Sequence, residues 1–168
     1  GLGIRKSDLF AAVGGFSAGI LPGSYRFDCD RQSLLGEAIQ KSGAVEMPYF
    51  SATGTSDTVV PFINKDNWQK NAFFAAWQIY QIMNGMSVTE RPDFSKDTIF
   101  GITLENRETI WTNKGISMET GVLSKNGVPL IQMVAVNDYG HWNFKPAAKM
   151  MWDYFMQFSR CLLYTSDA

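Results

Sequence analysis

Short apolar segments alternate with amphipathic segments along this chain, and this alternation restricts the fold more than any other feature. Apolar residues recur every three or four positions across residues 66–84, which predicts a helix that ends at Gly85. Two further helices are predicted, over residues 30–42, where Asp30 can cap the first turn, and over residues 145–160. Strands alternating with helices indicate an α/β protein in which helices flank a sheet. The predicted strands span residues 10–16, 45–53, 109–113, 116–123 and 130–136.

The last two predicted strands are joined by Asn126 and Gly127. This dipeptide is a strong signal for a two-residue β-hairpin turn, because both residues accept the positive φ angles that the turn needs. The sheet is therefore expected to contain an antiparallel hairpin near the C-terminus.

Composition narrows the classes of function. The chain has 15 basic and 16 acidic residues, so its net charge of −1 creates no overall field that favours nucleic acid or an anionic membrane surface. No apolar run approaches the ~20 residues of a membrane-spanning helix. Cys29 and Cys161 match neither a disulfide framework nor a metal-ligand pattern, and a single histidine cannot build a His-rich metal site. No metal or other cofactor is implied, and any imidazole chemistry depends on His141.

Two polar loops directly follow predicted strands. Residues 54–61, Gly-Thr-Ser-Asp-Thr-Val-Val-Pro, contain Asp57, and residues 137–142, Asn-Asp-Tyr-Gly-His-Trp, contain His141. Ligands of α/β sheets bind beyond the carboxyl ends of the strands, so both side chains are expected at one crevice. An aspartate that accepts the Nδ1–H of a histidine fixes its tautomer and leaves the other nitrogen free to act as a base. Three alternatives stay open: Asp57 as a turn former, His141 as a structural residue, and Asp138 as the acid.

The motif of residues 54–61, the later Gly-His step and the closing helix together resemble α/β-hydrolase esterases. The group with the most similar motifs comprises polyhydroxybutyrate-depolymerase-like enzymes and the feruloyl and acetylxylan esterases, and it includes enterochelin-esterase-like enzymes. The triad of this fold follows the order Ser, Asp, His, so the resemblance implies that Asp57 is the triad acid and His141 the general base. It also implies a mostly parallel sheet flanked by helices. Residues 1–160 would form the C-terminal portion of one such domain, and residues 161–168 a non-native or disordered tail.

Ser17 is the candidate nucleophile within this sequence. Residues 15–19, Gly-Phe-Ser-Ala-Gly, match the pattern G-x-S-x-G, but a nucleophile elbow also needs a helix directly after the serine. Pro22 and Gly23 would end such a helix within about one turn. In the resembled family this stretch is the strand that follows the elbow. The nucleophile and the first half of the sheet are therefore expected to precede Gly1, and Ser17 as nucleophile is the alternative. Such a chain should expose an unpaired sheet edge and apolar surface.

The function that the resemblance implies is a serine-type carboxylic ester hydrolase that works through an acyl-enzyme. Its substrates would be acyl esters of polysaccharides, or small hydroxyacid and aryl esters, and Trp142 and Phe144 beside His141 are expected to contact them. Relatives of this kind are often exported, which suggests a secreted or periplasmic location, although residues 1–20 lack the pattern of a signal peptide. The oligomeric state is left open. The alternatives are a non-catalytic binding or scaffold domain on the same fold and a peptidase-type acyl hydrolase.

Overall fold

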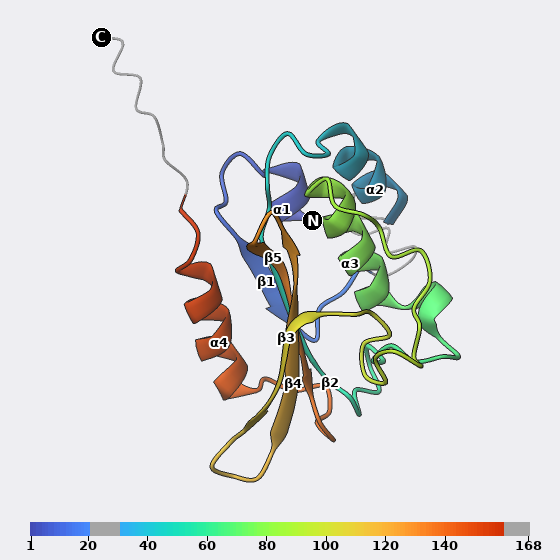
Figure 1. Ribbon diagram of the computed structural model, residues 1–168, viewed down its shortest axis with the longest axis vertical. Coiled ribbons are helices and arrows are strands. Elements are labelled where there is room, and N and C mark those ends of the chain that lie inside the picture. Colours follow the sequence, from blue (N-terminus) through green and yellow to red (C-terminus); the bar gives the residue numbers. More distant parts are fainter. Residues whose placement is uncertain (21–30, 160–168) are drawn as a thin grey trace.

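A computed structural model describes residues 1–20 and 31–159, which form one sheet with helices on both faces (Figure 1). The predicted α/β class is confirmed. The strands are β1 (Val13–Phe16), β2 (Tyr49–Gly54), β3 (Glu105–Trp111), β4 (Ser117–Lys125) and β5 (Val128–Val136), and they lie in the order β1-β2-β5-β4-β3. The helices are α1 (Leu2–Arg5), α2 (Arg31–Gln40), the short 3-10 helix η1 (Trp68–Lys70), α3 (Ala72–Met83) and α4 (Lys145–Phe155).

The sheet is mixed, which corrects the expectation of a mostly parallel sheet. β1, β2 and β5 are parallel neighbours, whereas β4 pairs antiparallel with both β5 and β3. Two tight turns produce the antiparallel pairs β3–β4 and β4–β5, because a short turn joins only strands that run in opposite directions. The turn between β4 and β5 is the predicted turn at Asn126 and Gly127, whose φ angles are 53° and 79°. The turn between β3 and β4 follows Trp111 and contains Gly115, whose φ is 75°.

An apolar layer lies on each face of the sheet, between the strands and the helices that cover that face. α4 covers one face, and α1, α2 and α3 cover the other (Figure 1). All six residues of β2 are buried, because its side chains alternate between the layers: Tyr49 joins the α3 side and Phe50 the α4 side. Strands covered on both faces need few charged residues, in agreement with the 18% charged content of the chain. β2 and β5 thus form the buried centre of the sheet.

The helix expected over residues 66–84 is divided in two. Asn71 interrupts it, and the side chain of Asn71 accepts hydrogen bonds from the backbone N–H groups of Phe73 and Phe74. Such a cap stabilises a new helix start at α3. The other elements shift by a few residues at their ends, and β3 begins at Glu105, ahead of the strand predicted over residues 109–113. The expected cap at Asp30 lies outside the described residues.

β1 forms one edge of the sheet within the described residues. Only β2 pairs with β1 in residues 1–20 and 31–159. A hollow of about 430 Å³ adjoins this edge, lined by small residues of the β1 segment together with Tyr49 and Tyr80. Trp111, Trp142 and Trp152 are large apolar side chains that are exposed elsewhere on the surface. The described part of the chain therefore presents one edge at β1 and several exposed tryptophans.

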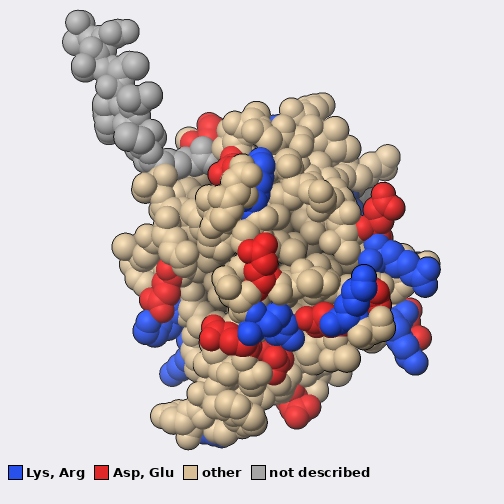
Figure 2. All heavy atoms as spheres, in the orientation of Figure 1, with Lys and Arg blue, Asp and Glu red and all other residues tan. Residues whose placement is uncertain are grey.

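Charged side chains are intermixed on the face shown in Figure 2, where acidic and basic residues lie beside one another. That face has no large patch of a single sign, in keeping with the net charge of −1. Across the described residues, every helix is too short or too polar to cross a lipid bilayer.

A buried carboxylate fixes the segment that leads into β3. Asp97 Oδ1 accepts hydrogen bonds from the N–H groups of Ile99 and Phe100 at 2.9 and 2.7 Å, and Oδ2 pairs with Arg107 Nε at 2.9 Å. The substitution Asp97→Ala would leave these donors without their acceptor. It is expected to lower the free energy of unfolding by about 3 kcal/mol, measured by urea denaturation.

Asp93→Ala is the matched control for this substitution. Asp93 also accepts from a backbone N–H two residues ahead, that of Ser95, and pairs with Lys96, but it is exposed to solvent. Water can replace these interactions, so the control should lose far less stability. Equal losses in the two variants would show that burial of Asp97 is not what matters.

Candidate active site

Asp57 and His141 lie in contact at the carboxyl ends of two strands. Asp57 follows β2, which ends at Gly54, and His141 follows β5, which ends at Val136. Because β2 and β5 are parallel neighbours, their carboxyl ends meet at one edge of the sheet. His141 Nδ1 lies 2.8 Å from Asp57 Oδ2, which is hydrogen-bond distance. The structure thus brings together the two side chains expected at one crevice.

Hydrogen bonds connect the loop that contains Asp57 (residues 54–61, the acid loop) to the loop that contains His141 (residues 137–142, the histidine loop). Thr55 N–H donates to the carbonyl of Val136 at 2.9 Å, and Ser56 N–H donates to the carbonyl of Tyr139 at 3.0 Å. The N–H of Asp138 donates to Thr55 Oγ1 at 2.9 Å. These three bonds hold the acid loop and the histidine loop at a fixed separation.

Gly54 allows the two loops to come this close. A Cβ atom at this position would overlap the carbonyl oxygen of Tyr139. The absence of a side chain is therefore what permits the approach. This role was missed at the sequence level, although a glycine within a buried strand is a known signal of close backbone approach.

The carboxylate of Asp57 is inaccessible to solvent and fully engaged. Its side chain is 0% exposed, and Oδ1 accepts hydrogen bonds from the N–H groups of Val59 and Val60, each at 2.8 Å. Burial alone would raise the pKa of Asp57, but hydrogen bonds from Val60, His141 and Val59 oppose this effect, and the pKa lies below its ordinary value. Asp57 is thus a carboxylate at neutral pH, with Oδ2 turned to His141.

The depressed pKa of Asp57 predicts how stability depends on pH. A carboxyl whose pKa is lower in the folded than in the unfolded chain stabilises the fold at pH values above the unfolded value, here 3.8. That contribution disappears as the pH falls through the folded-state pKa. Thermal melting measured from neutral to acidic pH should therefore show a steeper fall for the native chain than for Asp57→Asn, which has no carboxyl to protonate. Parallel curves for the two proteins would contradict this assignment.

His141 is reachable from solvent, in contrast to its partner. Its side chain is 39% exposed. Since an ionised carboxylate only accepts hydrogen bonds, the proton between the two residues belongs to Nδ1 of the ring. Nε2 is left with a free lone pair, which is the arrangement that a general base needs.

Asp138, the alternative acid, occupies a different position. It is exposed and has a positive φ of 55°, and its backbone N–H is bound by Thr55 as described above. Within the described residues, no hydrogen bond or ion pair links Asp138 to His141. Its position at the bend of the histidine loop is that of a loop-shaping residue.

Ser17 lies at the end of β1, beside the acid. Its N–H donates to the carbonyl of Ala52 at 2.8 Å, and its φ is 47°. The Ser17 hydroxyl oxygen is buried and has no hydrogen-bond partner within the described residues. Residues 18–20 are not helical, so the helix of a nucleophile elbow does not begin directly after this serine. Pro22 and Gly23, expected to end such a helix, lie outside the described residues.

The two aromatic residues expected to contact substrate differ in exposure. Trp142 is 77% exposed, directly beside His141. Phe144 is only 7% exposed, and its ring packs against Tyr139 and Phe16 at centroid distances of 4.9 and 6.5 Å. Trp142 is open to solvent, whereas Phe144 anchors the histidine loop to the layer under α4.

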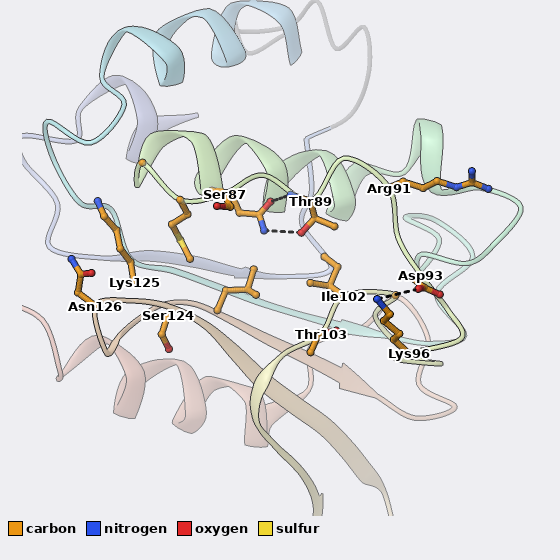
Figure 3. A pocket seen from close by; sticks show the side chains of 15 residues that line it. Ser87, Thr89, Arg91, Asp93, Lys96, Ile102, Thr103, Ser124, Lys125 and Asn126 are labelled. Atoms are coloured by element: carbon orange, nitrogen blue, oxygen red, sulfur yellow. Dashed lines mark hydrogen bonds and ion pairs between the residues drawn. The ribbon is translucent and has the colours of Figure 1, made fainter.

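A hollow lies away from this pair, between the end of α3 and the β4–β5 turn (Figure 3). It measures about 700 Å³, and Gln81 and Thr89 on its wall exchange two hydrogen bonds of 2.9 and 3.1 Å. Neither Asp57 nor His141 lines it, because the β4–β5 turn lies at the amino end of β5. Polar side chains dominate its wall, among them Ser87, Arg91, Thr103, Ser124 and Lys125.

The pair of Asp57 and His141 is therefore the chemically distinctive feature of the described residues. Among them, no group of three or more histidine, cysteine, aspartate or glutamate side chains is arranged to hold a metal ion. An oriented, partly exposed imidazole backed by a buried carboxylate can take up and return a proton. Neither the known protein-family models nor the curated proteins include a match to this chain.

Proposed function

We propose that this chain carries the acid and the base of a serine-type carboxylic ester hydrolase with an α/β-hydrolase fold. The observation that carries the proposal is the 2.8 Å contact of His141 Nδ1 with Asp57 Oδ2 at the ends of two parallel strands. The resemblance of residues 54–61 to the acid loop of these esterases supports it as well. On this proposal, the nucleophilic serine belongs to a segment preceding Gly1.

In the proposed reaction, His141 Nε2 accepts the proton of the serine hydroxyl while the serine oxygen attacks the ester carbonyl. The imidazolium that forms is stabilised by the carboxylate of Asp57. Collapse of the tetrahedral intermediate breaks the ester C–O bond, and the proton on Nε2 passes to the leaving alcohol. Water then attacks the acyl-enzyme while Nε2 accepts a proton from it. Collapse of the second tetrahedral intermediate breaks the bond to the serine oxygen, which takes the proton back from Nε2, and the carboxylic acid is released.

The substrate class proposed for this site is an acyl ester of a polysaccharide or a small hydroxyacid or aryl ester. The exposed ring of Trp142 beside His141 supports it, because a flat aromatic face can stack on a sugar or an aryl group. The test of Trp142 is Trp142→Ala, which should raise KM for an aryl ester more than it lowers kcat. An unchanged KM would remove Trp142 from the binding surface.

Fluorophosphonate labelling of the complete protein tests the proposed function. The reagent should attach to one serine outside residues 1–168, and His141→Ala should abolish the labelling. Comparison of aryl esters with the matching anilides distinguishes an esterase from a peptidase. A complete protein that neither labels nor hydrolyses either substrate would refute the proposal.

A non-catalytic binding domain is the second candidate. One observation favours it: within residues 1–20 and 31–159, no serine hydroxyl is hydrogen-bonded to His141, so this part of the chain shows no assembled triad. In such a domain the contact of Asp57 with His141 would only shape the two loops. The labelling experiment separates the two candidates, since a binding domain has no activated serine.

A further inference from the structure

The chain enters the histidine loop through a four-residue turn, residues 136–139, that its own backbone closes only loosely. The N–H of Tyr139 donates to the carbonyl of Val136 at 3.4 Å, which is longer than the usual range for such a bond. Of the four residues, Asp138 alone has a positive φ, of 55°. A type II turn requires a positive φ at this third position, where glycine or asparagine is the usual residue. The shape of the turn therefore depends on support from outside it.

Thr55 of the acid loop supplies this support at two points. Its N–H donates to the carbonyl of Val136 at 2.9 Å, and its Oγ1 accepts from the N–H of Asp138 at 2.9 Å. These are the first and third residues of the turn, so Thr55 binds the turn on both sides of its second residue. Both bonds are shorter than the 3.4 Å bond within the turn. Thr55 thus does more to fix the turn than the turn's own closing bond does.

One of the three hydrogen bonds between the loops depends on a particular side chain. The bonds donated by the N–H groups of Thr55 and Ser56 use backbone atoms on both sides, and every residue except proline has such a donor. The bond from the N–H of Asp138 instead needs an oxygen on the side chain of residue 55. A threonine hydroxyl offers two lone pairs for it, whereas a valine of the same shape offers none. The identity of residue 55 therefore decides whether this bond forms.

The turn lies directly before the base. Only Gly140 separates residues 136–139 from His141. After the histidine, Phe144 is 7% exposed and packed into the layer under α4, so His141 lies between two anchored points. The 2.8 Å contact of Nδ1 with Asp57 Oδ2 depends on how the ring is directed, because hydrogen bonds weaken steeply as their geometry departs from linear. The direction in which the backbone leaves the turn therefore affects this contact.

We propose that Thr55 is a positioning residue for His141. Its hydroxyl holds Asp138 in the left-handed conformation, and the turn formed in this way keeps Nδ1 of the imidazole directed at Asp57. The catalytic consequence of this role rests on the proposed function, whereas the contact between the two loops does not.

The test compares two substitutions of Thr55 in the 168-residue chain, with folding verified by circular dichroism. Thr55→Val keeps the branched shape and removes the acceptor, and Thr55→Ser keeps the hydroxyl and removes the methyl group. Because the chain has one histidine, the Nδ1 proton of His141 can be followed as a single imidazole N–H resonance. This resonance should be lost in Thr55→Val and retained in Thr55→Ser. The amide of Asp138 should exchange with deuterium up to about tenfold faster in Thr55→Val only, as the loss of one hydrogen bond allows.

Thr58→Val is the matched control, because Thr58 lies exposed on the acid loop and its side chain makes no hydrogen bond within residues 1–20 and 31–159. It should leave the resonance of His141 and the exchange of Asp138 unchanged. If Thr55 acted only through packing of its methyl group, the serine variant would be the more damaged of the two. That order, or a retained resonance with unchanged exchange in Thr55→Val, would overturn the proposal.

The complete protein separates this proposal from the proposed function. If esters are hydrolysed, Thr55→Val should lower kcat by about tenfold with KM retained, a part of the roughly 10²-fold or more that a positioned base contributes. Thr55→Ser should keep most of the activity. If no esterase activity exists but the resonance still distinguishes the two variants, the proposed function fails and the positioning role stands. Hydrolysis with full kcat in Thr55→Val would refute the positioning role alone.

Discussion

Replacement of Asp57 by asparagine is expected to lower kcat/KM for an aryl acetate by about 10⁴-fold without unfolding the protein. The amide oxygen of asparagine can still accept from the N–H groups of Val59 and Val60, which now bind Oδ1 at 2.8 Å. The amide NH₂ then faces His141 Nδ1 and donates to it, so the ring carries its proton on Nε2 instead. An imidazole already protonated on the reacting nitrogen cannot accept a proton from the nucleophile.

The rates are measured on the complete protein, and circular dichroism verifies that each variant is folded. Asp138→Asn is the matched control, because it makes the same change of charge on the neighbouring loop at an exposed side chain. This control should keep its activity within a few-fold, as expected for a screened surface charge. A large loss in Asp138→Asn, with activity retained in Asp57→Asn, would transfer the role of acid to Asp138.

Substitution of Gly54 by alanine is expected to separate the acid from the base. The new methyl group would occupy the space of the Tyr139 carbonyl oxygen, so the histidine loop must move away. Overpacking of backbone against backbone should lower the free energy of unfolding by about 3 kcal/mol. Displacement of His141 by about 1 Å should lower kcat/KM on the order of 10²-fold.

The single histidine makes this displacement directly observable. The Nδ1 proton of His141 should give one protected imidazole N–H resonance in the native chain and lose it in Gly54→Ala. Gly36→Ala is the matched control, since Gly36 lies within α2 and a Cβ there would meet nothing within 4 Å. That control should gain up to about 1 kcal/mol of stability, because alanine favours helix. A retained resonance and full stability in Gly54→Ala would contradict the proposed role of Gly54.

The contact between Asp57 and His141 could be predicted because it depends on topology. Polar residues that follow neighbouring parallel strands must meet at one edge of the sheet, whatever the details of packing. The Asn126-Gly127 turn was predictable for a similar reason, since its residues alone determine its geometry. Both features can be predicted from the sequence because one depends on a few neighbouring residues and the other on the alternation of strands and helices.

Other features depend on contacts between segments distant in sequence and could not be predicted. The periodic apolar pattern of residues 66–84 favours one helix, yet the side chain of Asn71 caps a new start within it. The burial of Phe144, at the start of α4, follows from its packing against Phe16, which lies on β1. The backbone hydrogen bond of Ser17 to Ala52 likewise requires the pairing of β1 with β2. Motif matching alone would have assigned Ser17 to nucleophilic attack.

The attachment of the two loops to the central strands has a consequence for local opening of the protein. β2 is buried along its whole length and pairs on both sides, and the N–H of Thr55 extends its ladder with β5 to the carbonyl of Val136. Elements of this kind open only with the global unfolding of a domain, whereas loops on peripheral elements open by themselves. The amide of Thr55 should therefore exchange with deuterium as slowly as those of β2. Asp57 and His141 then remain paired for as long as the sheet persists, so the imidazole keeps one orientation whether or not a ligand is present.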